Sequence, residues 1–256
     1  MPDLSMYDWL KGHDVFTWLE PLWSSGRWFL NDDSKLEAVR TQIAIDTPWV
    51  HHGHLDANHC MIGQLLFNTI SQGIKQHFAD FAPFVPSGCQ DCYKVVVRPQ
   101  TLIQLFALDD LEAKIGHPCK CGIEMRTSVD ALYGGYFYNR GLESGRECYR
   151  KVREAIDNDP HLGPDVPVIL KRACTEMEHL AGASDKWEIH PEQMVIEDLV
   201  KEWIVVAPDA NKQPDPIIWR TKRKWIEWAR SHGDKTYLKF TGDKPIVPGY
   251  VTYQGE

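Results

Sequence analysis

Two close pairs of cysteines constrain this chain more than any other feature of its sequence. Cys89 and Cys92 form a C-x2-C pair, and Cys119 and Cys121 form a C-x-C pair after a further 26 residues. Two thiolates from one tight turn can reach a single ion, and a second such turn completes a tetrahedral site. Proline and glycine stand beside both pairs, as in turn-forming sequence. The spacing therefore predicts a fold that brings four thiolates to one metal.

The sequence around these cysteines predicts a small β-sheet. A β-branched run at 93–98, helical spacing over 102–115 and a possible second strand at 122–126 indicate a β-α-β unit over about residues 93–126. A third strand is expected near 131–138. Each cysteine pair precedes one of the first two strands, and neighbouring parallel strands begin at the same end of a sheet. We therefore expect both pairs at one sheet edge.

Helices are expected to surround this sheet, so the predicted fold class is α/β or α+β. The capping box that begins at Ser34 predicts a helix over about 34–45. From residue 142 onward, apolar residues recur at helical spacing. These stripes predict several helices, one of which carries Leu170, Ala173, Cys174 and Met177 and the last of which covers about 216–231.

Length and composition favour one folded domain. The chain has 256 residues, of which 43% are hydrophobic and 25% charged, as is ordinary for a globular protein. We expect a single metal-binding domain over 1–256. Its aromatic-rich N-terminal extension covers 1–32, and a C-terminal helix with an extended tail covers 215–256.

The charge and the cysteine count limit the class of partner and the compartment. A formal charge of −8 argues against general nucleic-acid binding, which needs a surplus of Lys and Arg. Seven cysteines, without an export signal or a long apolar run, favour metal or redox chemistry in the cytoplasm over a disulfide framework. We therefore expect no membrane partner.

The identity of the metal has two interpretations. Four thiolates suit Zn²⁺ in a closed structural site, and they equally suit a [4Fe-4S] cluster. Glycine commonly follows the second cysteine of a zinc turn, which holds for Cys121 but not for Cys92. We expect structural zinc, with the iron–sulfur cluster as the alternative and Cys148 as an extra ligand. The opposing interpretation is that these thiols are buried and bind nothing.

A histidine-rich segment offers candidate catalytic residues. His54, Asp56 and His59 combine the imidazole and carboxylate ligands of a catalytic zinc or non-haem iron. The string His52–Asp56 resembles part of the H-x-H-x-D motif of metallo-β-lactamase-like hydrolases. Ala57 stands where that family has a further histidine, so we expect neither its fold nor its activity. Alternatively, Asp56 or Asn58 caps a helix and the histidines are surface residues.

Aromatic residues suggest two further surfaces. Tyr136, Tyr138 and Arg140 are candidate ligand-binding residues, because tyrosines on one strand face can stack on a planar ligand. The alternative is that they are core residues or cross-strand pairs, which is the more common role of aromatic strand residues. The last helix carries basic residues among tryptophans, namely Arg220, Lys222, Arg223 and Lys224 with Trp219, Trp225 and Trp228.

Three functions follow as expectations. The first is a metal-binding protein in which four thiolates hold structural zinc. The second is an iron–sulfur enzyme or electron-transfer protein that uses the same cysteines. The third is a protein–protein interaction module that docks through its aromatic N-terminus and Trp-rich last helix. The sequence does not decide whether the chain is an enzyme.

Overall fold

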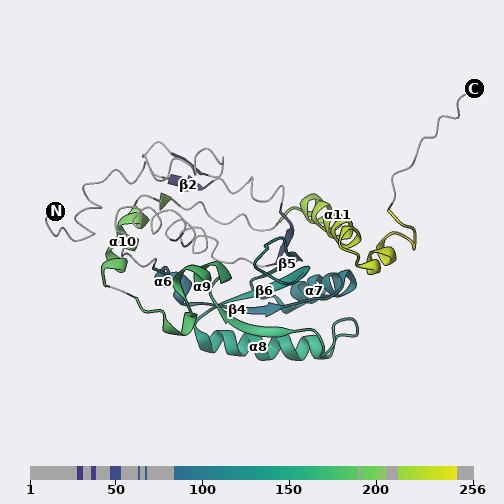
Figure 1. Cartoon of the computed structure of the whole chain (residues 1–256), viewed down its shortest axis with the longest axis horizontal. Coiled ribbons are helices and arrows are strands. Elements are labelled where there is room, and N and C mark those ends of the chain that lie inside the picture. Colours follow the sequence, from purple (N-terminus) through teal and green to yellow (C-terminus); the bar gives the residue numbers. More distant parts are fainter. Residues whose placement is uncertain are drawn as a thin grey trace, which may run out of the picture.

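The computed structural model places a sheet-and-helix body at the centre of the chain (Figure 1). It describes residues 28–30, 36–38, 47–52, 63, 67, 84–189, 191–202, 204–205 and 213–246. The described elements are, in chain order, β1 (Trp28–Leu30), β2 (Leu36–Ala38), β3 (Trp49–His52), α6 (Ser87–Gln90), β4 (Cys92–Val97), α7 (Leu102–Ile115), β5 (Cys119–Ile123), β6 (Tyr133–Arg140), α8 (Leu142–Asp157), β7 (Val168–Arg172), α9 (Thr175–Ala181), η2 (Ser184–Lys186), α10 (Pro191–Glu202), β8 (Ile204–Val205), α11 (Asp215–Ser231) and η3 (Lys235–Phe240).

The main sheet has five strands in the order β3-β5-β6-β4-β7. Every neighbouring pair in it is antiparallel. A second, three-stranded sheet joins β1, β2 and β8. An antiparallel sheet with helices between its strands is an α+β fold, which confirms the predicted class.

The elements β4-α7-β5-β6-α8-β7 form a split β-α-β arrangement, the topology of ferredoxin-like domains. The predicted β-α-β unit is present, and β4 and β5 run in the same direction. They are not neighbours, because β6 lies between them and pairs with both. Our expectation of adjacent parallel strands was therefore wrong. The topology hosts many unrelated activities, so it does not identify a function.

Helices α7 and α8 cover one face of the main sheet, and Figure 1 shows α8 running along it below β4. The core between them contains Val95, Phe137, Leu105, Leu108 and Val152. Side chains of a strand alternate between its two faces, so the neighbours of Val95 and Phe137 point to the other face. We call these two sides the helix-covered face and the polar face.

Local signals set the ends of α7. The Thr101 hydroxyl accepts a hydrogen bond from the Gln104 amide at 3.3 Å, which caps the helix start. Gly116 ends the helix at φ 66°, a left-handed conformation that glycine adopts without a steric penalty. These caps place the following β5 at the end of the sheet where β4 also begins.

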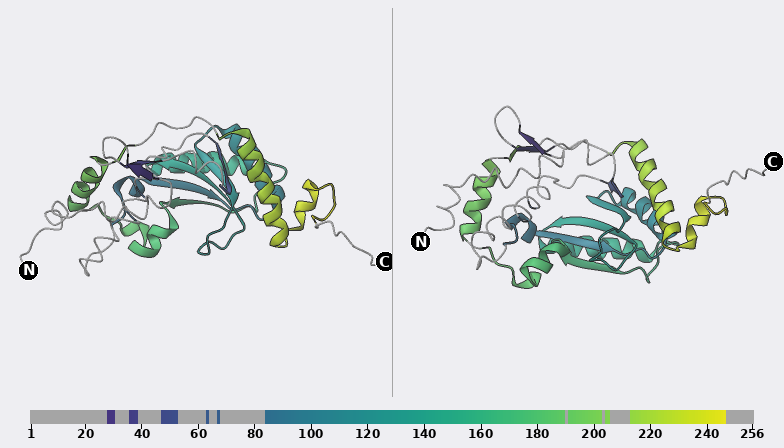
Figure 2. Two further views of the ribbon diagram at one scale, coloured as in Figure 1. Left: turned by 90° about the horizontal axis from the view of Figure 1, so that it is seen from above. Right: turned by 45° about the horizontal axis from the view of Figure 1, so that its top comes forward.

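Helix α11 packs against the edge strand β3 and contributes Trp225 and Ala229 to the same core. The buried Trp225 indole donates to the Pro48 carbonyl at 2.8 Å, and the Thr221 hydroxyl donates to the Thr47 carbonyl at 3.1 Å. Figure 2 shows α11 and α10 at opposite ends of the sheet. No helix in the described ranges combines the length and apolar character that a membrane crossing requires.

Two helix predictions differ from the structure. Residues 36–38, inside the helix expected over 34–45, form β2 and pair with β1 and β8. Leu170, expected on a helical stripe with Cys174 and Met177, lies in β7 and pairs with Val95. Both predictions failed because strand pairing with distant segments overrode a short local pattern. The helices expected after residue 142 and over 216–231 are present as α8 and α11.

Asp234 links the C-terminal segment to the sheet and to α7. Its carboxylate accepts hydrogen bonds from the Leu102 amide at 2.6 Å, the Tyr133 hydroxyl at 2.7 Å and the Thr236 amide at 3.0 Å. Burial alone raises the pKa of Asp234, but the hydrogen bonds from Tyr133 and Thr236 lower it below its ordinary value. The carboxylate is therefore ionised near neutral pH.

Replacing Asp234 by Asn is expected to lower the free energy of unfolding by about 1–3 kcal/mol, because charge-assisted bonds to Leu102 and Tyr133 are lost. Since the folded pKa lies below the unfolded value of about 3.9, this contribution is present above about pH 4. It is lost as pH falls through the folded pKa. Urea unfolding at pH 7 and pH 3 measures both effects. The exposed Asp243→Asn is the control, and equal losses in the two variants would contradict the assignment.

Candidate functional site

The polar face gathers charged and aromatic side chains over four strands. We define it by Lys94 of β4, Lys120 of β5, Tyr136 and Tyr138 of β6, Lys171 of β7, and Glu124, which follows β5. Lys94 lies directly across from Tyr138 on one side and from Lys171 on the other. Lys120 lies across from Tyr136. Polar residues thus occupy a sheet face that the helices α7 and α8 do not cover.

Tyr136 is the centre of a buried hydrogen-bond network. Its hydroxyl donates to Glu124 Oε2 at 2.7 Å and accepts from Arg98 and Arg126, each at 2.7 Å. Arg126 also binds both oxygens of Glu124, at 2.7 and 2.6 Å. Gly134 makes room for this network, because a Cβ there would lie 2.7 Å from the Arg98 guanidinium.

The network keeps Glu124 ionised although its side chain is fully buried. Burial raises the pKa of this carboxyl, but hydrogen bonds from Arg126 and Tyr136 lower it below its ordinary value. Burial raises the pKa of Tyr136, so the phenol stays protonated and donates. Two guanidinium groups therefore face one carboxylate and one neutral phenol.

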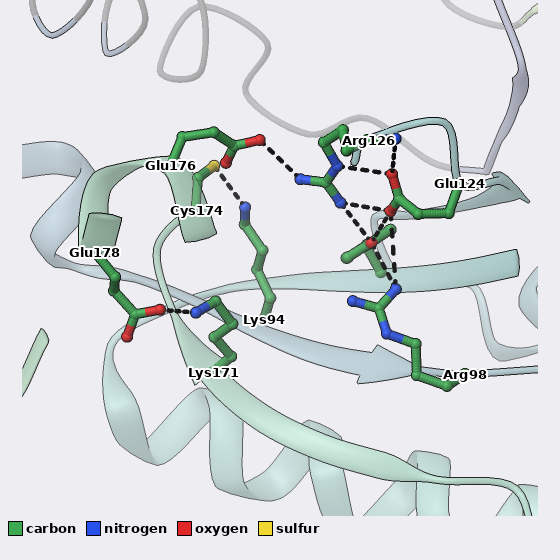
Figure 3. Close-up of polar contacts among 9 residues, drawn as sticks. Lys94, Arg98, Glu124, Arg126, Lys171, Cys174, Glu176 and Glu178 are labelled. Carbon is green, nitrogen blue, oxygen red and sulfur yellow. Dashed lines mark hydrogen bonds and ion pairs between the residues drawn. The ribbon is translucent and has the colours of Figure 1, made fainter. Parts of the chain in front are cut away.

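A second group of side chains lies beside this network, towards α9 (Figure 3). Lys94 Nζ donates to the Cys174 thiol at 2.8 Å, and Lys171 pairs with Glu178. Arg126 reaches Glu176 at 3.0 Å and so joins the two groups. Cys174 is partly exposed and lies just before α9. It was expected to be a core residue of a helix. It does pack against a hydrophobic cluster, but it precedes α9 and its thiol accepts a hydrogen bond from Lys94.

Cations outnumber carboxylates over this part of the molecule. Lys94, Arg98, Lys120, Arg126 and Lys171 are five cations, and Glu124, Glu176 and Glu178 are three carboxylates. Among these described side chains the cations exceed the carboxylates by two, in a chain of net charge −8. A local surplus of this kind favours an anionic ligand.

The expected tyrosine platform is only partly available for stacking. Tyr136 and Tyr138 do share the polar face, two positions apart on β6. Tyr136 is 6% exposed, and Trp49 packs edge-on against its ring with centroids 5.5 Å apart. Tyr138 is half-buried below Lys94, and Arg140 is exposed at the end of β6. Tyr138 and Arg140 are therefore the more accessible of the three candidates.

The structure does not bring the four candidate cysteines together. Cys92 lies across from Arg140 of β6, whereas Cys119 lies across from Phe137. These two β6 positions differ by an odd number of residues, so Cys92 and Cys119 point to opposite faces of the sheet. Cys121 shares the helix-covered face with Cys119.

The other two cysteines are also apart. Cys89 lies in α6 and packs with Phe67, Val85 and Met177 in a separate small cluster. Cys148 of α8 lies in the main core, on the same face as Cys119, which fits its expected position near that residue but not near all four. Among the described residues, no three His, Cys, Asp or Glu side chains are already arranged to hold a metal ion. Zinc or iron–sulfur binding by the four cysteines stays a prediction.

Some of the remaining candidate residues lie outside the part of the chain that the structure describes, and others lie in α11. His54, Asp56 and His59 lie outside the described residues, so their catalytic role stays a prediction. In the Trp-rich last helix, Trp225 is buried in the core, while Trp219 is 62% exposed. Lys222 from its basic stretch pairs with Asp109 of α7.

A groove of about 660 Å³ runs between α8 and β7. It contains none of the residues predicted from the sequence to form a site. Its lining residues are Glu143, Arg146, Tyr149, Arg150, Val168, Ile169 and Leu170.

Sequence reasoning missed Lys94, Arg98, Glu124 and Arg126. Alternation was the available signal, because a lysine at 94 beside valines at 95 and 97 must face away from the valines. The partnership of Glu124 with Arg126 and Tyr136 had no such signal, since it depends on the position of β6.

No family model, curated protein or solved structure matches this chain. The geometry of its own residues therefore carries any functional argument.

Replacing Tyr136 by Phe is expected to lower the free energy of unfolding by about 1–3 kcal/mol, because Glu124, Arg98 and Arg126 each lose a buried partner. Chemical denaturation measures the change. The control is Tyr149→Phe on α8, which is expected to stay within about 0.5 kcal/mol of the parent. A Tyr136→Phe protein as stable as the control would show that the network contributes little.

Proposed function

We propose that the polar face binds a small anionic ligand between Lys94, Lys171 and Arg126. The observation that carries this proposal is the direct cross-strand placement of Lys94 opposite Lys171. Like charges that face each other across two strands repel and destabilise the sheet. An anion between the two ammonium groups would remove this repulsion.

The electrostatics of Lys171 support the proposal. Burial, and then the charge of Lys94, lower the pKa of Lys171. Lys171 is thus destabilised by a neighbouring cation, and Glu178, Cys174 and Glu176 offset part of this effect. The side chains of Lys171 and Arg126 are 21% and 36% exposed, so a ligand can approach them from solvent.

The chemistry favours a small ligand over a long polyanion. The local surplus is two charges and the whole chain carries −8, so a long phosphate backbone would be repelled beyond this site. One phosphate group, with a charge of about −2 at pH 7, matches this surplus of two positive charges. A planar group attached to it could stack on Tyr138, in keeping with the platform expected from the sequence.

Replacing Lys171 by Met is expected to weaken binding of inorganic phosphate about three- to tenfold, because one of the facing charges is lost. Isothermal titration calorimetry measures the affinity, which is also expected to fall as NaCl is added. The matched control is Arg146→Met, which removes an exposed cation of α8 paired with Glu143. Absence of phosphate binding, or equal loss in both variants, would overturn the proposal.

The affinity for a nucleoside monophosphate shows whether the site recognises phosphate alone or a whole nucleotide. If a base stacks on Tyr138, the nucleotide is expected to bind about tenfold more tightly than phosphate, and Tyr138→Ala is expected to abolish that difference. Equal affinities would limit the ligand to the anion itself.

We propose as a second function that Cys174 is a reactive thiol. The observation that favours it is the 2.8 Å contact between Lys94 Nζ and the Cys174 thiol. The Lys94 ammonium group is in direct contact with the sulfur and would stabilise negative charge that develops there during a reaction, and partial exposure admits a reagent. An anion bound beside Lys94 would lie next to this thiol.

Replacing Lys94 by Met is expected to slow alkylation of Cys174 by iodoacetamide about tenfold at pH 7, since the thiolate loses its stabilising cation. Peptide mapping by mass spectrometry reads the modification of Cys174 separately from that of the buried Cys119 and Cys121, which serve as internal references. Unchanged Cys174 kinetics in the Lys94→Met protein would refute an activated thiol.

A further inference from the structure

The buried side of α7 carries carboxylates where a core helix should carry apolar residues. Leu105, Leu108, Asp109 and Glu112 recur at the spacing of one helix face and all are buried. This face packs on β5 and β6. Two of its four positions therefore bring acidic groups into the main core.

Glu112 is the more unusual of the two carboxylates. It is 0% exposed, and within the part of the chain that the structure describes its oxygens have no hydrogen-bond partner other than the weak thiol donors Cys121 and Cys119. A buried carboxylate without a partner is costly, and native proteins rarely retain one unless an ion or a chemical role explains it. The burial of Glu112 is therefore explained if a cation binds the carboxylate or a proton neutralises it.

Two thiols lie beside this carboxylate. Cys119 and Cys121 are two positions apart on β5, so both side chains point towards α7. Gly135 is the partner of Cys121 across the strands, and a Cβ on Gly135 would lie 3.1 Å from Glu112 Oε1. The absence of a side chain at Gly135 thus lets the carboxylate settle next to Cys121.

Asp109 completes the cluster from the preceding turn of α7. The Cys121 sulfur lies 3.9 Å from Asp109 Oδ1. The His52 imidazole lies 2.7 Å from the same oxygen, and Lys222 pairs with the other oxygen. These two contacts fix the orientation of the carboxylate. Such outer contacts are the usual way in which proteins orient metal ligands.

We propose that Glu112, Cys119 and Cys121, with Asp109 as the fourth ligand, form a buried zinc site on the helix-covered face. Zinc accepts mixed sulfur and oxygen ligands in a tetrahedral arrangement. With Zn–S near 2.3 Å and Zn–O near 2.0 Å, sulfur and oxygen ligands of one ion lie about 3.5 Å apart. The sulfur–oxygen separation of 3.9 Å between Cys121 and Asp109 is close to that value. The four side chains are not already arranged to hold an ion, so they would have to draw together on binding.

The protonation of these groups agrees with the site. Burial, with the charge of Glu112 added, raises the pKa of both thiols above the ordinary value, and burial raises the pKa of Glu112 well above its own. Burial therefore favours the protonated, neutral form of each group. Zinc binding would release their protons to solvent and offset part of the negative charge of the four ligands, with Lys222 beside Asp109.

This site shares only Cys119 and Cys121 with the four-cysteine site, so cysteine variants distinguish the two. The full chain is loaded with zinc and dialysed, and bound zinc is measured by elemental analysis. One equivalent is expected in the parent and in the control variants Cys89→Ser and Cys92→Ser. Cys119→Ser, Cys121→Ser and Glu112→Gln are expected to bind zinc at least tenfold more weakly.

Glu112→Gln keeps the shape of the side chain and removes only its charge, so the fold, checked by circular dichroism, is expected to survive. Equal loss of zinc in Cys92→Ser and Cys119→Ser would overturn the proposal in favour of four thiolates. A parent protein that retains no zinc, or a folded Glu112→Gln protein that binds it undiminished, would overturn it as well.

Discussion

Strand β6 pairs with both β4 and β5, and this insertion decides which residues of the chain share a face. The pairing fixes Cys92 opposite Arg140 and Cys119 opposite Phe137. Because side chains alternate along a strand, the two cysteine pairs are divided between the two sides of the sheet. The same register lines up the polar face, where Lys94 meets both Tyr138 and Lys171.

The sequence predicted most helices and strands of the central body but not the order of the strands in its sheet. Periodicity located β4, α7, β6 and α8, because their patterns are long and bounded by turns. It set the strand after α7 at 122–126, whereas β5 covers Cys119–Ile123. It could not place β6 between β4 and β5, since strand order depends on pairing between distant segments. The C-x-C pair was read as a turn, yet it forms the start of β5, where alternate positions give both thiols one direction.

The two buried carboxylates Glu124 and Glu112 have pKa values shifted in opposite directions because their neighbours differ. Glu124 has Arg126, Arg98 and Tyr136 as partners, so its pKa is lowered and its charge stabilises the polar face. Glu112 has two thiols and Asp109 as neighbours, and burial raises its pKa. The first site holds excess cations and suits an anion, whereas the second holds proton-bearing ligands and suits a metal ion. The sequence gives both residues the same type, and only the fold separates them.

The division of the cysteines by β6 is tested most directly by X-ray absorption spectroscopy at the zinc edge of the zinc-loaded full chain. This measurement counts the sulfur and the oxygen or nitrogen ligands around the bound ion. If the sheet separates Cys92 from Cys119, the spectrum will show two sulfurs near 2.3 Å and lighter ligands near 2.0 Å. A shell of four sulfurs would contradict the arrangement of β4, β5 and β6 described above.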